Sequence, residues 1–296
     1  MKELHNPTFP KVPTVLVPRS RALLQRASVA APANAESFSA VQASDAAHAS
    51  GASIALHWAQ HQDEVRAAQR LRHQVFVTEL GARLSTPIPG HDIDLFDDYC
   101  EHLLVRRTDT HEVIGTYRVL TPVQAQRVGS SYGDVEFDLT RLRRLRGRMV
   151  ELGRSCVHPN HRHGGVIMAL WRGLIEFMLR NRLDTMMGCA SIPMLHNSVV
   201  SGDVAASVWR QVREEHLAPI TDHVLPRLAL PVERLDDTLE VAPPALIRGY
   251  LRMGAKVLGP PAWDPDFNTA DLPMLLRVAD MPPRYRGHFI GTERSR

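Results

Sequence analysis

The sequence predicts an α/β (α+β) fold in which helices flank one central mixed sheet. Short segments with alternating apolar residues, typical of strands, lie between segments whose apolar residues recur three and four positions apart, as in amphipathic helices. With 44% hydrophobic and 23% charged residues, the composition is that of a globular protein. Strands and helices in this mixed order are typical of a layered fold built on one sheet.

The folded domain is expected to begin near residue 51. Residues 1–50 are rich in Pro, Ala and Ser and have few large apolar side chains. Such a segment cannot bury enough surface to offset the entropy lost on ordering. We therefore expect a flexible N-terminal extension over 1–50 and one domain over 51–296. Prolines interrupt the basic N-terminus and no apolar run leads to a cleavage site, so a secretory signal is not expected.

The domain is predicted to open with a strand, a helix and a hairpin. Alternation predicts a strand from Ile54, and helical spacing predicts a helix with Asp63 as its N-cap. Residues 103–120 form two apolar runs around the turn at 108–111, which is typical of a hairpin. A strand at 151–157 then leads through a glycine pair to an amphipathic helix. The other predicted elements are strands at 185–190, 256–258 and 272–278, and helices at 203–215 and 245–253.

The glycine pair Gly164-Gly165 stands between a predicted strand and a predicted helix. Backbone N–H groups stay open at such a helix start, where the helix dipole favours an anion such as a phosphate. Arg162 adds a positive charge beside the pair. The alternative, that the glycines only form a tight turn for packing, stays open.

The strand at 151–157 carries two charges in an otherwise apolar run. Strand alternation predicts that Glu151, Gly153 and Ser155 share one side and that Arg154 lies on the other. A carboxylate on the cleft side is a candidate for catalysis. A structural ion pair involving Arg118 is the alternative, because buried charges on strands must find partners.

Aspartates and aromatic residues are concentrated at residues 92–99, ahead of a predicted strand. In a partly desolvated cleft, such carboxylates select a cationic amino-acid side chain. A solvated loop is the alternative. The segment lacks the glycine and the closing glutamate of a calcium loop, so no metal site is predicted.

The three cysteines, Cys100, Cys156 and Cys189, are an odd number without metal-ligand spacing, which indicates a reducing compartment. Cys156 and His158 suggest a Cys-His acyl-enzyme mechanism, because alternation puts both on one face. However, residues two apart on a strand lie about 7 Å apart, and a cysteine in an apolar strand is more often a small buried residue. A covalent intermediate on Cys156 is therefore not favoured.

Seven segments, in order along the chain, carry a family resemblance: 71–77, 92–105, 115–120, 151–159, 169–171, 188–191, and 249–257 with 264–271. Together they resemble the L-ornithine N-acyltransferases of ornithine-lipid synthesis. These enzymes are a branch of the GNAT superfamily, close in fold to the acyl-homoserine-lactone autoinducer synthases. The resemblance covers roughly residues 54–290, which is most of the chain, and implies a GNAT-like acyl-CoA N-acyltransferase fold.

The resemblance also implies roles for individual residues. In the autoinducer branch, charged residues of the first helix, the following loop and two strands line the active cleft. The matching substrate-binding residues here are Arg72, Asp94, Asp97 and Arg118. The matching catalytic residues are Glu151, Arg154 and Ser155, with Glu151 as general base and a backbone N–H at 155–157 holding the oxyanion. The aspartates would bind the distal ammonium of ornithine, and Arg72 or Arg118 its α-carboxylate.

The phosphopantetheine of the acyl donor is expected between this strand and the next helix. The matching residues are Val157, Arg162, Gly164 and Gly165. The usual GNAT loop reads Gln/Arg-x-x-Gly-x-Gly/Ala, whereas Arg162 is here followed by His163-Gly164-Gly165-Val166 and the second small position is lost. This departure favours the single phosphate of an acyl-carrier-protein arm over the pyrophosphate of CoA. The thioester is a co-substrate, and no cofactor is expected.

A dense run of arginines precedes the Glu151 strand. We expect Arg143, Arg144 and Arg146 to dock the acyl carrier protein, because such carriers are strongly acidic. Anionic headgroups at the inner membrane are the alternative partner. Nucleic acid is not expected, since no recognition motif accompanies the arginines and the net charge is only +3. No apolar stretch could span a bilayer, so a cytoplasmic enzyme is expected, with peripheral membrane contact left open.

The expected reaction transfers a 3-hydroxy fatty acyl group from acyl carrier protein to the α-amine of L-ornithine, giving lyso-ornithine lipid. The alternatives are another N-acyl amino acid synthase, an acyl-homoserine-lactone synthase, or a non-catalytic module that binds a carrier or lipid.

Overall fold

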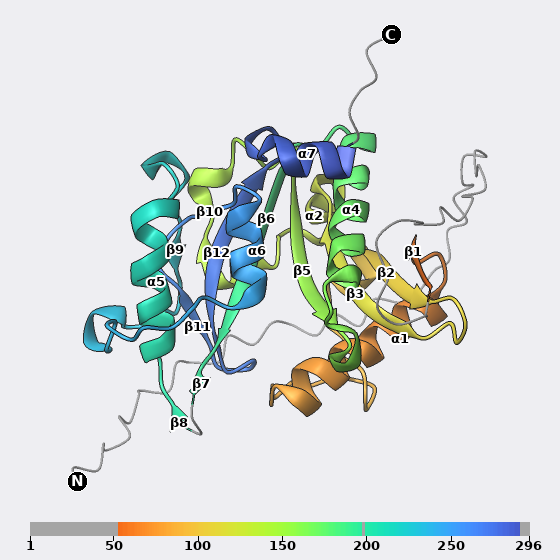
Figure 1. Cartoon of the computed structure of the whole chain (residues 1–296), viewed down its shortest axis with the longest axis horizontal. Helices are drawn as coiled ribbons and strands as arrows, with labels where there is room; N and C mark the ends of the chain where they lie inside the picture. The colour runs from red at the N-terminus through yellow and green to blue at the C-terminus, as the bar shows by residue number, and fades with distance from the viewer. Residues whose placement is uncertain (1–52, 197–198, 291–296) are drawn as a thin grey trace. The chain divides into compact units, whose positions relative to one another are not determined.

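The computed structural model describes residues 53–196 and 199–290. The expected N-terminal extension, residues 1–50, lies outside the described residues. The domain itself is a sheet with helices on both faces (Figure 1).

The main sheet has the strand order β1-β2-β3-β5-β6-β12-β10, and β11 pairs with β12. Its strands are β1 Ile54–Trp58, β2 Glu101–Arg107, β3 Val113–Leu120, β5 Met149–Val157, β6 Thr185–Pro193, β10 Lys256–Val257, β11 Ala262–Asp264 and β12 Thr269–Arg277. Neighbouring strands are antiparallel, except that β5 and β6 run parallel at the centre. The sheet is therefore mixed, as the sequence predicts.

Seven α-helices surround or extend from this sheet within the described residues. They are α1 Gln62–His73, α2 Pro122–Val128, α3 Gly133–Glu136, α4 Gly165–Arg180, α5 Asp203–His216, α6 Ala245–Arg252 and α7 Pro283–Ile290. The small two-stranded pairs are β4 Phe137–Asp138 with β9 Leu225–Pro226, and β7 Leu195–His196 with β8 Val199–Val200. A π-helix, Gln74–Glu79, continues α1.

The helices α1 and α4 lie on opposite faces of the sheet (Figure 1). Leu103 of β2 packs in the core cluster that contains Leu170 of α4. Its neighbour Leu104 packs in the cluster that contains Leu71 of α1. Because successive strand residues point to opposite faces, these two clusters lie on opposite faces of the sheet.

Most elements predicted from the sequence are confirmed within a few residues, but two expectations are wrong. The N-cap of α1 is His61 and not Asp63, because the Glu64 carboxylate accepts the backbone N–H of Gln60 and His61 and starts the helix earlier. The alternation expected along β5 is broken by a bulge.

The bulge lies at Arg154 and Ser155. Gly153 pairs with Arg118 and Cys156 with Thr116, so two residues of β5 oppose Tyr117 alone. Arg154 has a left-handed backbone, with φ +50°. The extra residue reverses the alternation. The Arg154 side chain consequently reaches aspartates that also bind Arg118, and Ser155 lies within hydrogen-bond reach of Tyr117 and Tyr250.

The central strands β5 and β6 separate after a short paired stretch. Their pairing ends at Leu152 and Gly188, yet β5 continues to Val157 and β6 to Pro193. A Cβ on Gly188 would lie 2.5 Å from the Leu152 carbonyl oxygen, so glycine permits the close approach at the last pair. Beyond it, the edge of β5 that faces β6 has no strand partner among the described residues.

Candidate active site

A cavity of about 230 Å³ opens where β5 and β6 separate. Its wall comes from β3, β5, β6, β11, β12 and α6, and from residues of the π-helix and of the loops before β2, α3 and β12. The polar and charged residues of the wall are Tyr117, Arg118, Tyr132, Glu151, Arg154, Ser155, Ser191, Tyr250, Asp264, Thr269 and Asp271. The sequence-predicted residues Arg118, Glu151, Arg154 and Ser155 are thus brought together on one cavity.

Glu151 is 8% exposed and lies on the wall of this cavity. Its carboxylate accepts the backbone N–H of Tyr132 at 2.6 Å and that of Gly133. Burial raises the pKa of Glu151 to about 7, although these two hydrogen bonds act in the opposite direction. A carboxylate with a pKa near neutral pH is suited to accept a proton from a reacting amine.

Arg72 lies in a buried ion network and not on the cavity wall. It is 0% exposed, and each of its three nitrogen atoms donates a hydrogen bond to Asp92 or Asp97. Asp97 also accepts from Gln69 and Arg118. Burial alone would raise the pKa of Asp97, but the charges of Arg72 and Arg118 outweigh it and hold the pKa well below its usual range. Neither Arg72 nor Asp97 has a group left for a substrate.

Asp94 joins this network to the cavity wall. Its carboxylate accepts from Arg118 at 2.6 Å and from Arg154 at 3.1 Å. The predicted pairing of Asp94 with a substrate ammonium is therefore replaced by pairing with two arginines of the chain. The guanidinium of Arg154 also stacks on Tyr132 and Phe267, at 4.9 and 4.6 Å from the ring centroids.

A second, apolar cavity of about 60 Å³ adjoins the first. The two share Tyr117, Leu152, Cys189 and Tyr250 as wall residues. The hydroxyls of Tyr117 and Tyr250 contact each other at this boundary. The remaining wall of the apolar cavity comes mainly from α4, β6 and β12 and includes Trp171, Leu174, Ile175, Met186, Met187, Met274 and Leu276.

The expected phosphopantetheine residues lie beyond the end of β5. Gly164 has φ +94°, which favours glycine, and precedes α4. No side chain of the described residues caps the start of α4, so its first backbone N–H groups stay open. Arg162 donates to the Val157 carbonyl oxygen and forms a bidentate pair with Glu79. The arginine is thereby held beside the helix start with its charge partly neutralised.

The three expected carrier-docking arginines differ in their surroundings. Arg143 is exposed. Arg144 pairs with Asp222, which is 1% exposed and also binds Arg277. Arg146 pairs with Asp134 at 2.6 Å. Two of the three therefore hold parts of the fold together.

The Cys-His mechanism has no geometric support. Cys156 packs in the core cluster on the α1 side and does not line the cavity. Burial raises the pKa of the Cys156 thiol to about 12, so its thiolate is not available near neutral pH.

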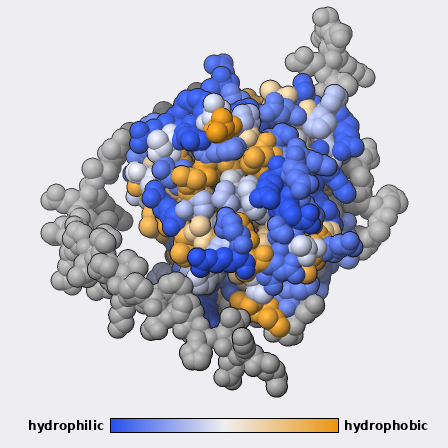
Figure 2. Space-filling model, turned by 90° about the vertical axis from the view of Figure 1, so that its left-hand side faces the viewer, coloured by the Kyte–Doolittle hydropathy of each residue, from blue (hydrophilic) through white to orange (hydrophobic). Residues whose placement is uncertain are grey.

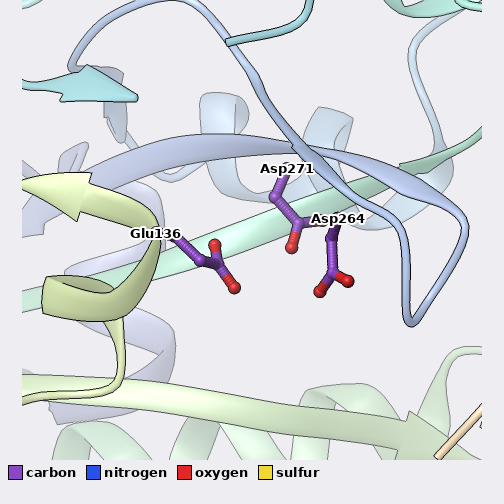
Figure 3. Close-up of side chains that lie close together, drawn as sticks. All are labelled: Glu136, Asp264 and Asp271. Carbon is purple, nitrogen blue, oxygen red and sulfur yellow. The ribbon is translucent and has the colours of Figure 1, made fainter. Parts of the chain in front are cut away.

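Asp264 and Asp271 of the cavity wall form a carboxylate cluster with Glu136, which is not itself a wall residue, and the sequence predicts no role for any of the three. One oxygen atom from each lies within 4.8 Å of the others (Figure 3). Asp264 and Asp271 stand in a segment that carries the family resemblance. Only the fold brings Glu136 to them, over more than a hundred residues of sequence.

The fold and the cavity define a GNAT-type N-acyltransferase: a mixed sheet opens between two parallel central strands, and a buried carboxylate faces the opening. The model of the acetyltransferase (GNAT) domain family matches residues 71–172.

The chain belongs to the L-ornithine N(alpha)-acyltransferase family. It is 34% identical over 255 residues to the enzyme of that name from Rhodobacter capsulatus, covering 80% of this chain and 95% of the relative. It is 32% identical over 262 residues to the Brucella abortus enzyme, covering 82% and 91%. Among solved structures it is similar to the acyl-homoserine-lactone synthase LasI, with 13% identity, a TM-score of 0.46 and coverage of 81% and 96%.

Proposed function

We propose that the protein transfers a 3-hydroxy fatty acyl group from acyl carrier protein to the α-amine of L-ornithine, giving lyso-ornithine lipid. Family membership supports the reaction and the acceptor. The structural observation that carries the proposal is the position of Glu151, on the same cavity wall as the unpaired part of β5. The general base, Glu151, therefore lies next to the strand edge on which the acyl donor can bind.

The open edge of β5 is suited to the acyl-pantetheine arm. Pantetheine carries two amide groups, which can pair with backbone groups of an unpaired strand as a further strand would. At the far end of β5, the uncapped start of α4 with Gly164 and Gly165 offers N–H groups to the phosphate. This route brings the thioester to the bulge at Arg154 and Ser155.

The apolar cavity between α4, β6 and β12 is suited to the fatty acyl chain. Its wall is formed mostly of Leu, Ile, Met and Trp side chains, and it begins where the polar cavity ends. Burying chain methylenes there stabilises the bound donor by about 0.8 kcal/mol each. The acyl carbonyl then lies near Tyr117, Ser155 and Tyr250.

The chemistry at the cavity requires a base and an oxyanion site. Glu151 takes one proton from the α-ammonium, and the free amine attacks the thioester carbon. Backbone N–H groups near the bulge of β5 stabilise the oxyanion of the tetrahedral intermediate. When the C–S bond breaks, the second proton of the attacking nitrogen passes to the departing thiolate, so amide and thiol are the products.

We place acyl carrier protein at the exposed Arg143, on the run that precedes β5. The free state of Cys100, Cys156 and Cys189 agrees with a reducing, cytoplasmic location. No helix among the described residues is long and apolar enough to cross a membrane. On the face shown in Figure 2, hydrophobic residues form patches between hydrophilic ones, which is compatible with a peripheral contact with the inner membrane.

The proposal is tested by incubating the purified protein with 3-hydroxyacyl carrier protein and with ornithine, lysine, glutamine, glycine or S-adenosylmethionine. Products are identified by mass, and the same series is run with 3-hydroxyacyl-CoA. We expect the fastest acylation with ornithine and the carrier thioester. Faster acylation of a neutral amino acid would assign another N-acyl amino acid synthase, and a lactone from S-adenosylmethionine would assign an autoinducer synthase. If no acceptor gives a product, the protein would be assigned as a non-catalytic module that binds a carrier or lipid.

A further inference from the structure

Three carboxylates from separate parts of the chain converge at the cavity wall, where Asp264 and Asp271 line the cavity and Glu136 lies beside them. Glu136 ends the short helix α3, Asp264 ends β11, and Asp271 lies in β12. Their side chains point toward one another (Figure 3). Their oxygen atoms, one from each, are no more than 4.8 Å apart. Like charges this close repel one another, so the cluster is costly unless something binds it.

The cluster has unused hydrogen-bond acceptors. Both carboxylate oxygens of Glu136 are buried and accept no hydrogen bond from the described residues, although the Cys189 thiol and the Tyr132 hydroxyl lie near. Asp271 is 5% exposed and accepts from Thr269 at 3.0 Å. Burial and the neighbouring charge of Asp271 raise the pKa of Glu136 to about 8, and burial raises that of Asp271 to about 6. Buried acceptors without donors are rare in native proteins and indicate a missing partner.

The other acidic cluster in the domain has the opposite character. Asp92, Asp94 and Asp97 are matched by Arg72, Arg118 and Arg154, which form ion pairs of 2.6 to 3.1 Å with them. The carboxylates of Glu136, Asp264 and Asp271, in contrast, form no ion pair with any described residue. The described residues therefore supply no cationic partner to this cluster, and a bound cationic group would complete it.

We propose that Glu136, Asp264 and Asp271 bind the side-chain ammonium of the acceptor amino acid and select ornithine over neutral amino acids. This inference rests on the proposed function and replaces Asp94 and Asp97 as the expected ammonium site. Points no more than 4.8 Å apart all lie within about 2.8 Å of a common centre, which is the usual length of a charge-assisted N–H···O bond. An ammonium has three hydrogens to donate, one to each carboxylate.

The two ends of the acceptor are connected through α3. Glu151 accepts the N–H of Gly133 at the first residue of this helix, and Glu136 is its last residue. A helix rises about 1.5 Å per residue, so the two ends of α3 are about one turn apart. The short helix α3 thus sets the spacing between Glu151, which takes the proton of the α-amine, and Glu136, which binds the side-chain ammonium.

A divalent metal ion is the competing occupant of this cluster. Arg154 lies close enough to lower the pKa of both Asp264 and Asp271 by its charge. The same positive charge opposes a doubly charged ion more strongly than an ammonium. We therefore assign the cluster to the ammonium, and the experiment below also tests whether it binds a metal ion.

The test compares ornithine with norvaline, which has the same carbon chain but no side-chain ammonium. Wild type, Glu136→Gln and Asp271→Asn are assayed with both acceptors, with Glu214→Gln on the exposed face of α5 as the matched control. We expect each cluster variant to lower kcat/KM for ornithine by about 30-fold or more, mainly through KM. Norvaline acylation should stay within about threefold of wild type, and Glu214→Gln should change neither.

The outcomes separate this inference from the proposed function. If wild type does not acylate ornithine, the proposed function fails. If wild type acylates ornithine and both variants keep the wild-type ratio of ornithine to norvaline, the ammonium site is overturned while the function stands. Loss of ornithine activity on treatment with EDTA, restored by Mg²⁺ or Ca²⁺, would assign the cluster to a metal and overturn the inference as well. A thermal unfolding curve for each variant shows that the protein is folded.

Discussion

The carboxylate of Glu151 accepts the backbone N–H of Gly133, which lies 18 residues earlier in the chain. A Cβ on residue 133 would lie 2.8 Å from Oε1 of Glu151. Glycine at this position is therefore required by the carboxylate, and the carboxylate in turn holds the start of α3.

Gly133→Ala should lower both stability and turnover. The added methyl group displaces the Glu151 carboxylate or the start of α3, and overpacking of this kind costs about 1–3 kcal/mol. We expect a lower melting temperature and a fall in kcat. Gly147→Ala is a matched control, because a Cβ there meets no atom within 4 Å. Equal behaviour of the two variants would contradict the contact.

Acylation should depend on the ionisation of Glu151. Burial raises its pKa to about 7, and the base works only when deprotonated. At saturating donor, kcat should therefore rise with pH and level off above an inflection near 7. A pH profile of kcat that is flat from pH 5.5 to 8 would rule out Glu151 as the titrating base.

Stability should change with pH in the opposite direction. The folded-state pKa values of Glu151, Glu136 and Asp271 are raised above their unfolded values by burial. The stability that their protonated forms contribute is full below the unfolded pKa, near 4, and is lost as pH rises through about 6 to 8. The melting temperature of the free protein should therefore fall between pH 5 and pH 8, and Glu136→Gln should reduce this fall. A melting temperature that rises across this range in wild type would refute the assignment.

Carrier docking should depend on Arg143. Arg143→Ser should raise the apparent KM for 3-hydroxyacyl carrier protein and flatten its salt dependence, since an exposed charge acts mainly on association. Short acyl-pantetheine thioesters should react as with wild type. Arg144→Ser serves as the contrast, because it also removes the ion pair with buried Asp222 and should lower the melting temperature. Equal loss with carrier and with pantetheine for Arg143→Ser would assign this residue to folding or catalysis.

Deleting residues 1–50 should leave acylation of ornithine largely unchanged. The segment has few large apolar side chains with which to join the core. The measurement compares kcat/KM and thermal unfolding of the truncated and full chains. A truncated protein that is insoluble or unfolded would show that the domain begins earlier.

The order of strands and helices could be predicted because it depends on local patterns. Alternation and helical spacing predicted β5 and α4, and the glycine pair predicted the start of α4. Glu151 and Arg118 could be placed on the cavity because they occupy motif positions in their strands. The bulge at Arg154 could not be predicted, because a bulge depends on how two strands pair and leaves no clear signal in either one.

Ion pairing explains the remaining differences at the site. Arg72 and Asp97 were expected to contact substrate, yet they neutralise one another inside the protein. The sequence alone does not show whether an aspartate faces an arginine or a cavity, because the answer depends on which residues the fold brings next to it. No sequence pattern marked Glu136, because it lies on a four-residue helix that is too short to show periodicity.

The central claim, that Glu151 accepts the proton of the acceptor amine, is tested most directly by single-turnover acylation of ornithine by Glu151→Gln. The amide can accept only one of the two backbone N–H groups at residues 132 and 133, so the rates are compared at a temperature where both proteins are fully folded. We predict a rate lower by roughly a hundredfold or more at pH 7. The rate of the variant should also rise steadily with pH, without the inflection near 7, as free amine becomes more abundant. A variant that acylates ornithine at the wild-type rate, with the same inflection, would contradict the claim.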